Sequence, residues 1–160
     1  MAAIQKRRGG TLLNLDRMLL NSPAYAVGWN TFLGAVRTGL SLDAKLRELA
    51  ICAVAVLNRA DYELVQHAPE FLQSGGTQAQ LDAIADVQAA IANSAVFDEA
   101  ERAVLAFTYE STCNVQVSNV CFDRLQQALP QAQQQVELAG VVAAYNMVSR
   151  FLEALQVAPE

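Results

Sequence analysis

A chain of 160 residues, of which 53% are hydrophobic, is long enough to bury most of its surface in one folded domain. Its net charge of −5 argues against a nucleic-acid partner, because binding to phosphate backbones depends on clustered Lys and Arg. No apolar run reaches the ~18 residues of a membrane-spanning helix, so we expect no membrane partner either.

Residues 1–10 are predicted to be a basic tail. Lys6, Arg7 and Arg8 form the one basic cluster of the chain, and no apolar stretch of the kind found in signal peptides follows them. We therefore expect a single domain over residues 11–157.

Apolar residues recur at helical spacing through this domain, and no alternation typical of strands occurs, which predicts an all-α fold. After a short leading helix, Ser22 is expected to cap a second helix over 23–39. Trp29 and Phe32 in that helix are expected to lie in the core or in an interface.

The centre of the domain is predicted to be a helix hairpin. Ser41 is expected to cap its first helix, over 42–57, and a polar corner should lead into a second helix over about 60–74. Pro69 should kink the second helix, because it lacks an N–H donor. Two glycines then allow a left-handed stop.

Further helices are predicted after the hairpin. Two capping-box patterns, Thr77-x-x-Gln80 and Asp98-x-x-Glu101, are typical of helix starts. In total we expect about seven to eight helices around the central hairpin. Those that follow it are expected at about 78–91, 98–109, 118–129 and 136–157.

The only histidine of the chain lies in the predicted hairpin, near two glutamates. Glu63 precedes His67 by four residues, so both side chains should share one face of a helix. Glu48 lies on the other arm, and antiparallel packing would bring it to the same face. Such a cluster could perform acid–base catalysis. A carboxylate should raise the pKa of the imidazole and fix its tautomer, and burial should raise the pKa of a glutamate.

Structural roles could account for the same residues. His67 could be a packed residue without a chemical role, and Glu63 could be stabilised by about 0.3–1 kcal/mol near a helix N-terminus. Glu48 could pair with a basic neighbour such as Arg47. Tyr62 could donate a hydrogen bond at the site or simply pack in the core.

Three cysteines occur without a CxxC pair, at positions 52, 113 and 121. We expect free thiols in a reducing, cytoplasmic compartment, with Cys52 as a small buried apolar residue. One histidine and no cysteine pair leave little from which to build a metal site, so neither a metal nor another cofactor is expected.

The spacing of the cluster resembles that of the carboxymuconolactone decarboxylase and alkyl hydroperoxidase D superfamily. Its peroxidase branch has a glutamate, then cysteines twelve and fifteen residues on, then a histidine nineteen residues on. Counted from Glu48, those places hold Ala60, Glu63 and His67, so both cysteines are absent. A glutamate four residues before the histidine instead looks like the decarboxylase branch. The resemblance covers roughly residues 23–155.

The resemblance implies a single-domain helical bundle of the alkyl hydroperoxidase D type. It also implies cofactor-free proton transfer, with decarboxylation or isomerisation of a small lactone or enolisable carboxylic acid. His67 would donate and accept protons, with Glu63 as its partner and Glu48 as a second carboxylate. Tyr62 and Arg47 are the expected substrate-binding residues. The cation for a substrate carboxylate is left open among four arginines: Arg47, Arg59, Arg102 and Arg150.

Two alternatives accompany this hypothesis. A helical oligomer that binds a small apolar ligand or a protein partner, and catalyses nothing, would fit the hydrophobic composition equally well. We expect a homo-oligomer in either case, and the resemblance implies a trimer or hexamer. Thiol peroxidase activity is disfavoured, because Ala60 and Glu63 stand where the attacking and resolving thiols would be.

Overall fold

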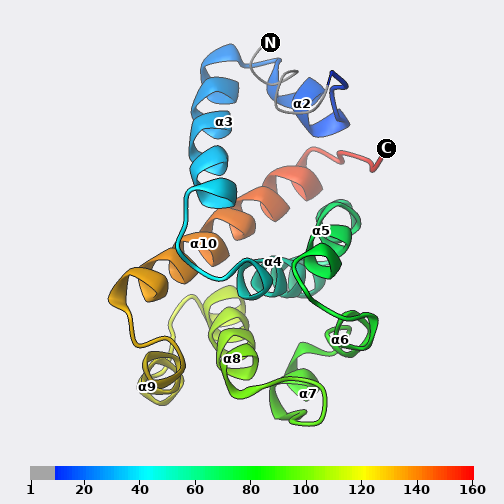
Figure 1. Cartoon of the computed structure of the whole chain (residues 1–160). Coiled ribbons are helices and arrows are strands. Elements are labelled where there is room, and N and C mark those ends of the chain that lie inside the picture. Colours follow the sequence, from blue (N-terminus) through cyan, green and yellow to red (C-terminus); the bar gives the residue numbers. More distant parts are fainter. Residues whose placement is uncertain (1–9) are drawn as a thin grey trace.

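The computed structural model describes residues 10–160, and every regular element within that range is a helix (Figure 1). The all-α prediction is therefore confirmed. The basic cluster expected in the N-terminal tail lies outside the described residues. The nine helices of residues 10–160 are α2 (Asn14–Leu19), α3 (Pro23–Thr38), α4 (Ala44–Asn58), α5 (Asp61–Gln73), α6 (Gln78–Ala83), α7 (Val87–Ala92), α8 (Glu99–Asn114), α9 (Asn119–Ala128) and α10 (Ala132–Ala154).

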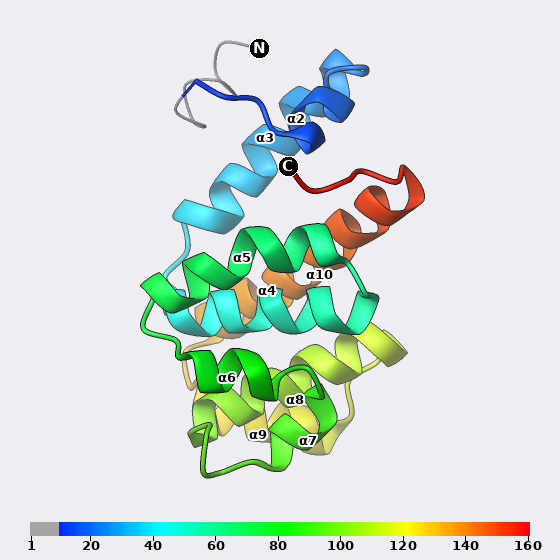
Figure 2. The same cartoon turned by 90° about the vertical axis from the view of Figure 1, so that its right-hand side faces the viewer.

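The predicted hairpin is formed by α4 and α5 and lies at the centre of the molecule (Figures 1 and 2). Every residue of α4 from Glu48 to Ala55 is buried, because α5, α8 and α10 all pack against this helix. Arg59 ends α4 in the left-handed conformation, with φ of 56°. The N–H of Ala60 then donates to the carbonyl of Ala55, and the chain turns directly into α5.

The start of α4 differs from the prediction. Asp43, and not Ser41, accepts hydrogen bonds from the backbone N–H groups of Lys45 and Leu46. Ser41 instead donates its hydroxyl to Glu137 of α10, at 2.9 Å. The cap is thus two residues later than predicted, and Ser41 fastens the loop before α4 to α10.

The stretch after the hairpin contains one more helix than expected. The capping box of Thr77 and Gln80 is present, but the helix that it opens ends at Ala83. Asp86 accepts from the N–H of Ala89 and so caps a separate helix, α7. The second capping box, Asp98 with Glu101, opens α8 as predicted.

Two apolar clusters occupy opposite sides of α4. The larger one joins α4 to α3 and α10, and it contains Trp29 together with Leu33 and Tyr145. The smaller one joins α4 to α5, α7 and α8. Phe32 does not belong to either cluster and is 48% exposed, so only Trp29 of the two aromatic residues lies in the core.

Helices α2 and α3 lie at one end of the molecule, above the hairpin in Figure 2, and the last residues of the chain run back to the same end. Glu160 connects these parts. Its Oε1 accepts from the backbone N–H of Asn14 at 2.6 Å, and its Oε2 accepts from Gln66 of α5 at 3.0 Å. These two bonds connect the start of α2 to α5 through the C-terminal residue.

Candidate active site

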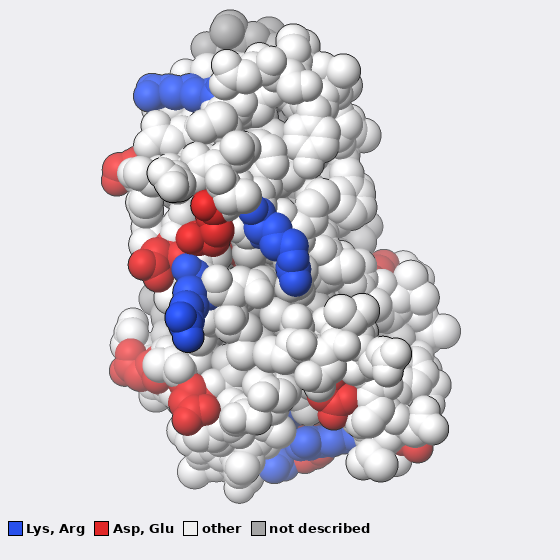
Figure 3. Space-filling model, turned by 180° about the vertical axis from the view of Figure 1, so that it is seen from behind, with Lys and Arg blue, Asp and Glu red and all other residues white. Residues whose placement is uncertain are grey.

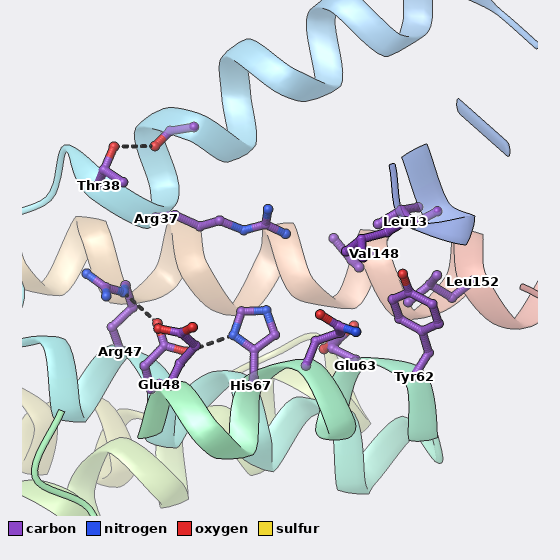
Figure 4. A pocket seen from close by; sticks show the side chains of 14 residues that line it. Leu13, Arg37, Thr38, Arg47, Glu48, Tyr62, Glu63, His67, Val148 and Leu152 are labelled. Atoms are coloured by element: carbon purple, nitrogen blue, oxygen red, sulfur yellow. Dashed lines mark hydrogen bonds and ion pairs between the residues drawn. The ribbon is translucent and has the colours of Figure 1, made fainter. Parts of the chain in front are cut away.

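A cavity of about 440 Å³ lies where α2, α3, α4, α5 and α10 meet (Figure 4). All five residues that the sequence analysis placed in the site contribute to its lining. The complete lining consists of Leu13, Leu15, Gly34, Arg37, Thr38, Arg47, Glu48, Tyr62, Glu63, Gln66, His67, Glu70, Val148 and Leu152.

His67 of α5 and Glu48 of α4 meet across the hairpin, as their spacing predicts. The distance from His67 Nδ1 to Glu48 Oε2 is 2.7 Å, and only 9% of His67 and 3% of Glu48 is exposed. Arg47 donates from Nε to the other carboxylate oxygen at 3.1 Å. Figure 4 shows the three side chains in a row along one side of the cavity.

The protonation of this pair differs from the prediction. Burial by itself would raise the pKa of Glu48, but the hydrogen bonds and positive charges of His67 and Arg47 bring it below its ordinary value. Burial lowers the pKa of His67 and outweighs the hydrogen bond and negative charge of Glu48. Glu48 does raise the pKa of the imidazole, as expected, but the net shift is downward because desolvation of the charged ring is the larger effect.

The tautomer of His67 follows from its partner. An ionised carboxylate can only accept hydrogen bonds, so Nδ1 carries the proton that Glu48 accepts. In the neutral ring the lone pair is then at Nε2. The Glu48 carboxylate thus fixes the tautomer of His67 in which Nε2, the nitrogen that does not bond to Glu48, is the basic one.

Glu63 lies beside the dyad without being the hydrogen-bond partner of His67 that we expected. Its Oε2 accepts from the hydroxyl of Ser149 of α10 at 3.0 Å. Its Oε1 is buried and has no hydrogen-bond partner within the described part of the chain. Burial is the main cause that raises the pKa of Glu63, from 4.5 to about 8. At neutral pH this side chain is therefore a protonated acid.

Two residues that sequence reasoning missed complete this part of the site. The ring of Tyr145 meets the ring of His67 edge-on, with the centroids 4.9 Å apart. The Tyr145 hydroxyl accepts from Nε of Arg37 at 2.9 Å. Figure 4 shows Arg37 reaching from α3 across the cavity, opposite His67 and Glu63.

Arg37 changes the choice of substrate cation. Of the four arginines considered from the sequence, only Arg47 lines the cavity. Arg59 ends α4, Arg102 pairs with Glu99, and Arg150 bonds to Asn146. The only sequence signal for Arg37 was its place in the last turn of an apolar helix, and nothing linked that helix to His67.

Tyr62 lies at the far end of the cavity from Arg47 (Figure 4). It is buried, with 4% exposed, and its hydroxyl donates to Glu160 Oε1 at 3.2 Å. Tyr62 thus both packs in the core and makes a polar contact, the two roles that the sequence left open.

The cysteines lie outside the cavity lining. Cys52 is fully buried, and burial, together with the charges of Glu48 and Glu63, raises its pKa to about 12. Its thiol therefore stays protonated and is a poor nucleophile. Cys113 is exposed and Cys121 is buried, and both are free thiols. Within residues 10–160, no three His, Cys, Asp or Glu side chains are placed to hold a metal ion.

Charged side chains are scattered over the face of the molecule shown in Figure 3. On the face shown in Figure 3, basic side chains are few and form no continuous patch of the kind that binds phosphate backbones. No helix in the described part of the chain is long and apolar enough to cross a membrane.

The chain was compared with known proteins. The model of the carboxymuconolactone decarboxylase family matches residues 23–109. This range includes α3, which carries Arg37, and the whole hairpin of α4 and α5. No curated protein sequence matches the chain.

Solved structures share the fold. A protein of unknown function from Agrobacterium tumefaciens, considered for AhpD-type antioxidant defence, has a TM-score of 0.80 at 16% identity, over 89% of this chain and 95% of that chain. An uncharacterized peroxidase-related protein from Silicibacter has a TM-score of 0.82 at 19% identity, over 99% and 82%. A cysteine-to-alanine variant of the debrominase Bmp8, in complex with 2,3,4-tribromopyrrole, has a TM-score of 0.82 at 18% identity, over 98% and 83%.

At such low identities these likenesses establish the fold, which is that of AhpD-like proteins. The match to the family model extends over more than half of the chain and includes Glu48, Glu63 and His67. The chain therefore belongs to the carboxymuconolactone decarboxylase family.

Proposed function

We propose that this protein catalyses cofactor-free proton transfer, leading to decarboxylation or isomerisation, on a small lactone or enolisable carboxylic acid. One observation carries the proposal: a base and an acid, each in the protonation state its task requires, line the same cavity. His67 is neutral with a lone pair at Nε2, and Glu63 is protonated at neutral pH. Environments that hold one group deprotonated and its neighbour protonated are typical of acid–base sites.

The two groups would act in sequence. In isomerisation, His67 Nε2 takes a proton from the carbon next to the carbonyl, and the electron pair of the C–H bond moves into an enolate. Glu63 then delivers its proton to another carbon of the conjugated system, and a proton passes from His67 to Glu63 through solvent. In decarboxylation, the bond to the carboxylate breaks, and CO₂ leaves with the electron pair staying on the enolate. Glu63 then protonates the carbanionic carbon and regains a proton from solvent, so one proton is consumed in each turnover. A positioned acid or base of this kind contributes about 10²–10⁴ in rate.

The surroundings favour an enolate. The guanidinium of Arg37 reaches over the cavity, and both reacting groups are largely buried, with 9% of His67 and 2% of Glu63 exposed. A fixed positive charge in a partly dry site stabilises developing negative charge more strongly than water does. Glu48 would act as a positioning residue, because it bonds to the ring of His67 on the side away from its basic nitrogen.

Thiol chemistry finds less support. Ala60 and Glu63 stand at the places of the two redox cysteines, and the Cys52 thiol is fully buried with a pKa raised to about 12. The similar structures include peroxidase-related proteins and a debrominase bound to a small halogenated pyrrole. Of these, the bound complex supports only the idea that this fold can enclose a small ring.

We also infer a homo-oligomer, as a trimer or hexamer. The support is the set of exposed apolar side chains on α3, where Tyr25 and Phe32 share one face and are 45% and 48% exposed, and Val27 on another face is 68% exposed. Sedimentation velocity would test this inference. A non-catalytic oligomer that binds small ligands would need the same surface but would not need the opposite protonation states of His67 and Glu63.

The proposal is tested by exchange and turnover in D₂O, with muconolactone, which carries one carboxylate, and α-angelica lactone as probes. We expect deuterium incorporation, isomerisation or decarboxylation with the wild type, and a loss of about 10²-fold or more in His67→Gln and Glu63→Gln. Asp123→Asn, at an exposed position on α9 far from the cavity lining, is the matched control and should keep the wild-type rate. Equal exchange in His67→Gln and the wild type would overturn the proposal.

A further inference from the structure

The cavity has two chemically different ends. In Figure 4, Arg47 and Glu48 lie at one end and Tyr62, Leu13 and Leu152 at the other, with His67 and Glu63 between them. Leu15 and Val148 add to the apolar end. Cavities of this size accommodate small organic molecules and bury most of their surface. A ligand that fills the whole space must therefore be polar at one end and apolar at the other.

The charges that line the cavity leave one cation, Arg37, without a carboxylate partner among residues 10–160. Arg47 is neutralised by Glu48, with a distance of 3.1 Å between the paired atoms. Arg37 donates from Nε to the neutral hydroxyl of Tyr145, and no described carboxylate lies within ion-pair distance of it. Glu63 is protonated and His67 is neutral near neutral pH, as argued above. Glu70 is exposed at the rim, where water screens its charge.

One anionic group can therefore be neutralised inside the cavity, and a second cannot. A carboxylate that reaches Arg37 can accept from the guanidinium nitrogens that Tyr145 leaves unused, because the fork of an arginine matches a carboxylate. A second carboxylate at the other end of the ligand would lie against Leu13 and Leu152, where none of the lining residues in the described part of the chain is a cation. Burial of an unpaired charge there is strongly unfavourable.

We propose that the site selects a monocarboxylate with an apolar body, held by Arg37 at its carboxylate and by the apolar end of the cavity at its tail. This inference rests on the proposed function for the reaction itself, but it concerns binding and needs no turnover. It narrows the substrate class from small lactones and acids in general to those with one negative charge and a hydrophobic substituent. Small dicarboxylates are excluded.

The apolar end of the cavity, where the tail of the ligand would lie, is formed partly by Leu13 and Leu15. Leu15 belongs to α2 and Leu13 directly precedes this helix, which Glu160 connects to α5 by hydrogen bonds to Asn14 and Gln66. Because Leu13 is only half-buried, it can be changed with little effect on the core. It is therefore the residue of choice for testing the apolar end separately from the charged one.

The test uses three unreactive probes of equal length: octanoate, octanol and suberate, which carry one, no and two carboxylates at the ends of the same chain. Binding to the full chain is measured by calorimetry and by the NMR shifts of His67. This residue is the only histidine, so its ring signals are unambiguous. We expect octanoate to bind at least tenfold more tightly than octanol or suberate, and to move the His67 signals.

Variants separate the two ends. Arg37→Gln should weaken octanoate about tenfold or more and leave octanol unchanged, whereas Arg37→Lys should restore part of the affinity. Arg150→Gln is the matched control, because Arg150 is exposed and bonds to Asn146, outside the cavity. Leu13→Asn should weaken octanoate and octanol alike. Suberate bound as tightly as octanoate, or octanoate affinity unaffected by Arg37→Gln, would overturn the inference. Neither result would affect the proton-transfer proposal, which is tested by exchange.

Discussion

Replacing Glu63 by glutamine should make the protein more stable at neutral and alkaline pH. The Glu63 carboxyl has its pKa raised from 4.5 to about 8 in the folded protein, mainly because it is buried. Between these two pH values the folded chain keeps a proton that the unfolded chain loses. The stability associated with this proton is complete below about pH 4.5 and is lost as the pH rises through about 8.

The magnitude follows from the same two values. Each pH unit between 4.5 and the working pH costs about 1.4 kcal/mol, which makes about 3 kcal/mol at about pH 7 and about 5 kcal/mol above about pH 8. Glutamine has nearly the same shape and cannot ionise, and its carbonyl oxygen can still accept from the hydroxyl of Ser149. Glu63→Gln should therefore match the wild type near pH 4.5 and exceed its stability by about 3 kcal/mol near pH 7.

Urea unfolding of both proteins at a series of pH values measures this difference. The titration of His67, whose lowered pKa destabilises the fold at acidic pH, is common to both proteins and is removed when one curve is subtracted from the other. Asp123→Asn, at an exposed position, should follow the wild-type curve throughout. Parallel curves for Glu63→Gln and the wild type would refute the reasoning, because Glu63 would then be ionised in both states.

Three further predictions concern other parts of the molecule. Glu48→Gln should lower the pKa of His67 further and reduce turnover by about 10²–10⁴, because the ring loses the carboxylate that raises its pKa and fixes its tautomer. An NMR titration of His67 identical to that of the wild type would contradict this prediction. Cys52→Ala should leave peroxide consumption unchanged, because the thiol is fully buried with a pKa raised to about 12; a measurable loss of consumption would revive the thiol mechanism. Gly76→Ala should destabilise the protein by about 1–3 kcal/mol in urea unfolding, because a Cβ there would lie 2.4 Å from the buried Phe71 ring. The control is Gly140→Ala, on an exposed face of α10 where a Cβ meets no other atom, which should stabilise the protein by up to about 1 kcal/mol.

The hairpin and its dyad could be read from the sequence because both depend on local rules. Two helical patterns joined by a short polar corner must pack antiparallel, and this packing brings Glu48 and His67 together at 2.7 Å. The spacing also placed Glu63 on the correct face of α5. It could not decide what Glu63 bonds to, because a shared face leaves the direction of the carboxyl to its neighbours, and the nearest hydroxyl belongs to Ser149 of α10.

The roles of Arg37 and Tyr145 could not be derived in the same way. The two residues are 108 positions apart and come together only because α3 and α10 pack over the hairpin. No local pattern in either helix indicates that contact. The direction of the pKa of His67 was missed for a related reason, since the extent to which the ring is desolvated depends on the same long-range packing.

The packing that would suit this site to the proposed proton transfer also lowers the stability of the folded protein at neutral pH. Desolvation favours the neutral form of both His67 and Glu63. For His67 this effect is opposed by the hydrogen bond and the negative charge of Glu48. For Glu63 it is opposed only by the hydrogen bond from Ser149 and the positive charge of Arg37. A neutral residue of the same shape in place of Glu63 would keep the packing and would remove the loss of folding stability that the raised pKa causes at neutral pH. A buried carboxyl whose Oε1 has no hydrogen-bond partner among the described residues fits the proposed reaction, which needs its proton. If Glu63→Gln is both more stable than the wild type and inactive, the Glu63 carboxyl lowers stability and is required for the proposed reaction.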